Sequence, residues 1–135
     1  MTNRDYLKIF NSFLDNDLFN QAIILSTNKI SEITKLQILD EIAYRLQVEF
    51  GKRVIFITNK ECSGDIETFT KKDKTSELPL LYTDKKNTVF VLYLDMPYFE
   101  DRLDWEQKVI ECLIYYKYPV FGFKSDNQRV KFYDI

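Results

Sequence analysis

The sequence contains no histidine, and its 135 residues include three glycines, three prolines and two cysteines. The absence of imidazole excludes Ser–His–Asp and Cys–His hydrolases, histidine-dependent nucleases and every metal site that uses a histidine ligand. Three isolated glycines cannot form a glycine-rich loop around a phosphate. Cys62 and Cys112 show no CxxC spacing, so neither a disulfide framework nor a zinc site is expected.

Long apolar runs and a strong charge imbalance are also missing. The apolar run 89–94 is far shorter than the roughly 20 residues that span a membrane. Lysine and arginine number 19 against 21 acidic residues, which gives a formal charge of −2. The first residues lack the charged and apolar stretches of a secretion signal. We therefore expect a cytoplasmic protein without a membrane segment.

Apolar and aromatic side chains are abundant, at 45% and 16% of the residues. This composition excludes intrinsic disorder. A chain of this length can bury a core of its own without disulfides or metals. We expect a single domain that spans 1–135.

Apolar residues at helical spacing predict four helices, which cover residues 3–14, 18–25, 32–50 and about 101–118. Ser31 is the expected N-cap of the helix over 32–50, and Gly51 its left-handed stop. Pro119 disfavours helix at the residue before it and ends the last helix. One face of that helix is expected to be buried, through Trp105, Val109, Cys112, Leu113 and Tyr116, with Tyr115 on the surface.

Runs of β-branched and aromatic residues predict strands at 54–57, 66–69, 80–83, 88–94, 120–123 and 129–133. The runs 54–57 and 88–94 are apolar on both faces, so we expect both strands to be covered on two sides and 88–94 to be central. Polar turns at 84–87 and 125–128 predict two hairpins. The expected fold class is α+β, with N-terminal helices and one helix of the C-terminal half packed on a mainly antiparallel sheet of about five strands.

The least ordinary segment is 95–106, which carries five acidic side chains and one basic side chain among Met, Tyr, Phe, Leu and Trp. Aromatic residues favour interface cores, and surrounding carboxylates steer association with a basic partner. Acids in a first helical turn and aromatics before a helix are equally typical of helix capping. The candidate partner-binding residues are Asp95, Tyr98, Phe99, Glu100, Asp101, Asp104 and Trp105.

From residue 32 onward, the order helix, three strands, helix, strand resembles the core of the PD-(D/E)xK nucleases. The resemblance implies magnesium-dependent cleavage, with Asp65 and Glu67 matching the acid that opens the second strand. The third strand, 88–94, has no acid or lysine within it, although this family carries an E-x-K there. The E-x-K of this chain, Glu106-Gln107-Lys108, falls in the last expected helix instead.

A third alternative is a structural subunit or homodimer joined through aromatics of the terminal hairpin, Phe121, Phe123, Phe132 and Tyr133. Direct nucleic-acid binding is not favoured, because the basic excess of 51–88 comes from lysines on expected loops. The sequence as a whole predicts a small non-catalytic binding protein of the inhibitor, immunity or adaptor type, with a protein partner. No catalytic residue, metal ligand or cofactor is predicted.

Overall fold

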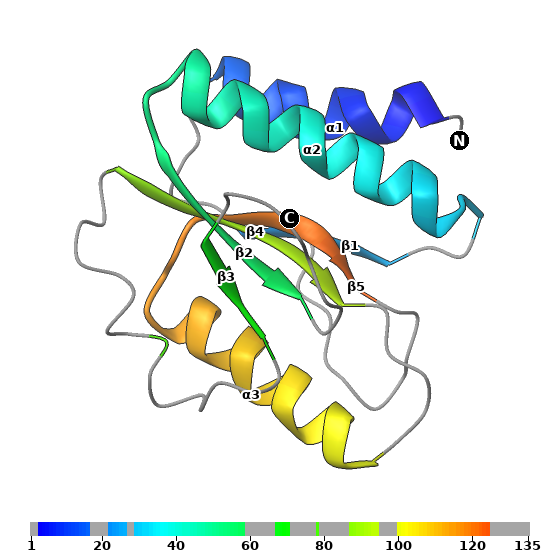
Figure 1. Cartoon of the computed structure of the whole chain (residues 1–135), viewed down its shortest axis with the longest axis vertical. Helices are drawn as coiled ribbons and strands as arrows, with labels where there is room; N and C mark the ends of the chain where they lie inside the picture. The colour runs from blue at the N-terminus through cyan, green and yellow to red at the C-terminus, as the bar shows by residue number, and fades with distance from the viewer. Residues whose placement is uncertain are drawn as a thin grey trace.

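The computed structural model describes residues 3–16, 22–26, 29–58, 67–70, 78, 87–94 and 100–124. These residues form three layers, with a five-stranded sheet in the middle (Figure 1). Helices α1 (Asn3–Asp15) and α2 (Glu32–Val48) cover one face of the sheet, and α3 (Glu100–Tyr115) covers the other. The strands are β1 (Ala22–Ser26), β2 (Arg53–Thr58), β3 (Glu67–Phe69), β4 (Thr88–Leu94) and β5 (Val120–Lys124).

All strand pairs in the sheet are parallel, so the expectation of a mainly antiparallel sheet was wrong. The order is β1-β5-β4-β2-β3, which places β4 in the centre as predicted. The sequence of β2 and β4 already favoured a parallel sheet, because both strands are apolar and buried on their two faces. Parallel sheets have this property since helices cover both of their sides. The outer strands of the two predicted hairpins, 80–83 and 129–133, lie outside the described residues.

The second correction concerns β1, which sequence periodicity assigned to a short helix over 18–25. Residues Ala22–Ser26 instead pair with β5, in the register Ile23 with Phe121. The run AIILS is too short to show whether its period is 2 or 3.6, and its two isoleucines favour a strand.

The two helix-containing crossovers explain why the helices lie on opposite faces. From β1 through α2 to β2, the chain moves across the sheet toward the β3 edge. From β4 through α3 to β5, it moves back toward the β1 edge. Since such crossovers are almost always right-handed, opposite directions require opposite faces. Each of the three helices runs back against the strands, so all three begin near the edge where the strands end (Figure 1).

The ends of the helices follow the local sequence. The Ser31 side chain accepts a hydrogen bond from the Thr34 amide at 3.1 Å, which confirms the predicted N-cap. Gly51 has φ +63°, the left-handed geometry predicted for the stop of α2. At the end of α3 the Tyr118 amide donates to the Leu113 carbonyl and the Lys117 amide donates to that of Ile114. This pair of bonds is a Schellman motif, with Lys117 in the left-handed region at φ 56°.

Each face of the sheet has its own apolar core. The core under α1 and α2 contains Tyr6 and Phe10, whose rings meet Phe123 edge-on with centroids 6.2 and 5.4 Å away. The core under α3 contains Trp105, stacked on Phe69 at 5.8 Å. Phe121 and Phe123 are fully buried, so the expectation that they form an exposed dimer surface was wrong.

The expected core stripe of α3 is correct for Trp105, Val109 and Leu113, which are buried. Tyr116 is 47% exposed, so its assignment to the core was wrong, while Tyr115 is on the surface as predicted. The reason is geometric, because Tyr116 follows the last helical residue and the chain turns there. The Tyr116 ring stacks instead on Tyr118, at 5.7 Å.

Candidate functional site at the carboxyl edge of the sheet

The edge at which the parallel strands end is the first place to search for a site. In open α/β sheets, ligands bind in the crevice outside the carboxyl ends of the strands. Here that edge is formed by the last residues of β1, β2, β4 and β5, and the first turns of the helices border it (Figure 1). The helix macrodipoles add partial positive charge at the same edge.

Buried polar side chains gather at this edge. Among the described residues five polar or charged side chains are buried: Lys35, Thr58, Thr88, Glu106 and Lys124. Thr58 and Lys124 are the last residues of their strands, whereas Lys35 and Glu106 belong to the first two turns of their helices. Only Thr88, which begins β4, lies at the opposite edge. A buried charge is costly unless something compensates it, so this asymmetry marks the carboxyl edge as special.

Lys35 is the most unusual of these residues. Its side chain is 6% exposed, and its ammonium nitrogen lies over the Phe123 ring, 6.0 Å from the centroid. In the described part of the chain, no carboxylate lies within ion-pair distance of this ammonium. Its position in the first turn of α2 adds repulsion from the helix dipole.

On the α3 side of the sheet, the same edge contains two buried ionisable side chains, Lys124 and Glu106. Lys124 is 2% exposed and lies in register with Leu94 and Ser26. Because Phe123 faces the other core, strand alternation directs Lys124 toward the α3 face. Glu106 is fully buried on the face of α3 that carries Val109 and Ile110.

Sequence reasoning did not predict that these three charged residues are buried, although a signal was present for each. Lys35 stands four residues before Leu39, within the apolar stripe of α2. Glu106 stands three and four residues before Val109 and Ile110, and Lys124 extends an apolar strand. A charged residue at a core position of an apolar pattern is the signal that would have found them.

The predicted partner-binding residues lie in different places in the structure. Glu100, Asp101 and Asp104 belong to the first two turns of α3, at the carboxyl edge. Trp105 is 9% exposed and stacked on Phe69, so its ring is part of the core. Asp95, Tyr98 and Phe99 lie outside the described residues.

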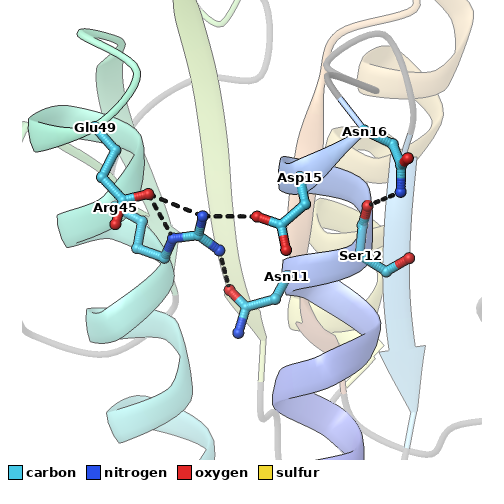
Figure 2. Close-up of polar contacts among 6 residues, drawn as sticks. All are labelled: Asn11, Ser12, Asp15, Asn16, Arg45 and Glu49. Atoms are coloured by element: carbon cyan, nitrogen blue, oxygen red, sulfur yellow. Dashed lines mark hydrogen bonds and ion pairs between the residues drawn. The ribbon is translucent and has the colours of Figure 1, made fainter.

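At the opposite, amino edge, the cation Arg45 has a structural role. Arg45 of α2 donates to Asn11 at 2.5 Å and to Asp15 at 2.8 Å, and thereby ties α2 to α1 (Figure 2). It also donates to Glu49 one turn further along α2, at 2.9 Å. Hydrogen bonds to Glu49 and then to Asp15 raise the pKa of Arg45.

Glu67, a candidate metal ligand in the nuclease alternative, is bound by Arg53 in a two-pronged ion pair with distances of 2.7 and 3.0 Å. This pair links β3 to β2, and the bond to Glu67 raises the pKa of Arg53. Asp65 lies outside the described residues. Within the described ranges no three acidic or cysteine side chains are grouped as a metal site would require.

Cys112 is a free thiol, half-buried in α3, and burial raises its pKa. Cys62 lies outside the described residues. None of the described helices is long and apolar enough to cross a membrane.

Comparison with known proteins gives no relative for this chain: no family model, curated protein or solved structure matches it.

Proposed function

We propose that this protein is a non-catalytic binding protein whose ligand site is the carboxyl edge of its parallel sheet. The observation that supports this proposal is that four of the five buried polar side chains in the described residues lie at that edge. Sheets of this architecture bind their ligands there because the strand ends and helix starts leave backbone and side-chain polar groups for recognition.

The non-catalytic part of the proposal is supported by the composition. Without histidine, general acid–base and nucleophilic catalysis at neutral pH would need carboxylates or lysines with strongly shifted pKa values. Incubation with labelled DNA and RNA in magnesium tests this directly. We expect no cleavage, and cleavage that is lost in Asp65→Ala would contradict the proposal and favour the nuclease.

Amide chemical-shift mapping on the ¹⁵N-labelled full chain tests the location of the site. The probes are nucleotides, sugar phosphates, dicarboxylic acids and short acidic or basic peptides. We expect a binding probe to move the amides of Thr58, Leu94 and Lys124. Binding that moves only amino-edge amides such as Arg53, Thr88 and Val120 would contradict the proposal.

A protein partner with a basic surface is the second candidate, engaged through Asp95, Tyr98, Phe99 and the start of α3. It is favoured by the position of Glu100, Asp101 and Asp104 at the same edge. The test is the variant Glu100→Gln with Asp101→Asn, in capture experiments against binders selected from a basic peptide library. We expect capture to be lost while the unfolding transition is retained, and unchanged capture would contradict this candidate. Trp105→Ala is unsuitable for this purpose because the ring is buried in the core.

A further inference from the structure

We propose that the edge beside Lys35 binds a phosphate group, either free or carried by a small molecule. This inference deepens the proposed function, because it names the chemistry that the α1 and α2 side of the carboxyl edge would recognise. It starts from Lys35, a residue that is 6% exposed and lies in the first turn of a 17-residue helix.

The surroundings of Lys35 favour an anion for two separate reasons. Lys35 as a residue is only 6% exposed, and the contact its ammonium makes in the described part of the chain is with the Phe123 ring. It also lies in the first turn of α2, where the helix dipole disfavours a cation. A cation–π contact compensates such a charge only partly. A negatively charged group at this place would offset both penalties.

The direction of the side chain agrees with this site. Helical side chains lean toward the N-terminus of their helix, which for α2 is the carboxyl edge of the sheet. Phe123, over which the ammonium lies, is the penultimate residue of β5 and pairs in register with Tyr93 and Leu25. Tyr93 in turn pairs in register with Thr58. The two hydroxyl side chains of Tyr93 and Thr58 therefore lie in the same line of paired residues as Phe123, near the end of the sheet.

Phosphate suits this combination better than a neutral ligand. A lysine and the start of a helix together attract a doubly charged oxyanion. Because Ser31 occupies the Thr34 amide, the lysine and the helix field would supply most of the attraction.

Calorimetric titration of the full chain with sodium phosphate and with a sugar phosphate, against sodium chloride at equal ionic strength, tests the inference. We expect phosphate to bind the wild type and Lys35→Arg, and to bind Lys35→Met about tenfold more weakly or worse. Lys52→Met, which changes a half-buried lysine at the amino edge, is the matched control and should bind as the wild type does. Binding of the ester alone or of both probes distinguishes a phosphorylated metabolite from free phosphate.

Amide shifts separate this inference from the proposed function. Phosphate should move the amides of Ile33, Thr34 and Phe123 in the wild type and leave them in place in Lys35→Met. The inference is overturned if neither probe binds, or if Lys35→Met binds as tightly as the wild type. If another class of ligand then moves the carboxyl-edge amides, the proposed function stands without the phosphate site, and if none does, both fail. Circular dichroism of Lys35→Met confirms that a loss of binding is not a loss of folding.

Discussion

At the scale of single residues, two backbone positions are under the strongest constraint. Lys117 occupies the left-handed region with φ 56°, where any residue other than glycine is strained. Gly122 lies where β5 passes β4 so closely that an added Cβ would be 2.1 Å from the Leu92 carbonyl oxygen. The first constraint concerns backbone conformation, and the second concerns space.

Replacing Lys117 with glycine should stabilise the protein by about 0.5–1 kcal/mol, because relief of the left-handed strain exceeds the extra entropy that glycine gains on unfolding. The midpoint of urea unfolding measures the change. Gly51→Ala is the matched control, since Gly51 has φ +63° and no atom within 4 Å of its added Cβ. That variant should lose a similar amount through strain alone. A destabilised Lys117→Gly protein would contradict the argument.

Gly122→Ala should destabilise the protein by about 3 kcal/mol, since the clash is with the backbone of Leu92 and no side-chain rotation relieves it. Urea unfolding gives the magnitude, and hydrogen exchange should show faster opening of β4 and β5 amides. A variant as stable as the wild type would show that the two strands are further apart than the structure has them.

At the scale of elements, α1 is attached to the domain by an apolar face and by a polar cluster around Arg45. Its buried residues Tyr6, Phe10 and Leu14 recur every four positions and pack on the sheet. The polar attachment is made by Arg45, whose guanidinium bonds Asn11 and Asp15 of α1 (Figure 2).

Replacing Arg45 with methionine should loosen α1, because two hydrogen bonds between the helices are lost while the apolar stem is kept. We expect a loss of about 1 kcal/mol, since Asp15 and Glu49 are largely exposed to water. Hydrogen exchange should accelerate in α1 more than in α3. Glu49→Gln, which removes only the negative charge from the contact within α2, is the control and should cost about 0.3–0.5 kcal/mol. Equal exchange in α1 of both variants would contradict this role.

At the scale of the whole molecule, two weakly acidic side chains, half-buried Cys112 and buried Tyr118, make stability depend on pH in the alkaline range. Burial raises the pKa of Cys112 above its usual 9.0. The pKa of Tyr118 is raised above its usual 10.0, first by burial and then by the neighbouring Cys112 and Tyr116. The folded protein therefore holds these protons at pH values where the unfolded chain releases them.

Since the unfolded chain then binds fewer protons than the folded one, the free energy of unfolding must fall as pH rises from about 9 upward. Urea unfolding between pH 7 and pH 10.5 measures this fall. The double variant Cys112→Ala with Tyr118→Phe should lose stability less steeply over the same range. An equally steep fall in the double variant would show that other groups are responsible.

Local features of the chain were predictable because they depend on neighbours in the sequence. Ser31 and Gly51 act as the predicted caps of α2, and β3 was found within a polar stretch by its β-branched and aromatic residues. The burial of β2 and β4 on both faces followed from their composition. The site was harder to predict from the sequence. Of the predicted partner-binding residues only Trp105 has a described side chain, and that side chain lies in the core.

The sequence by itself determined the composition of the core, the ends of α2, the position of most strands and, through the missing histidine, the exclusion of imidazole chemistry. Only the tertiary structure decided that the strands are parallel and that Ala22–Ser26 is one of them. The apolar runs of β2 and β4 indicate strands covered on both faces, as parallel strands are, but the direction of each strand is set by how the connections cross the sheet. The gathering of Lys35, Glu106 and Lys124 at one edge was likewise decided by topology, since these residues are far apart in the chain and share only the edge where strands end and helices begin.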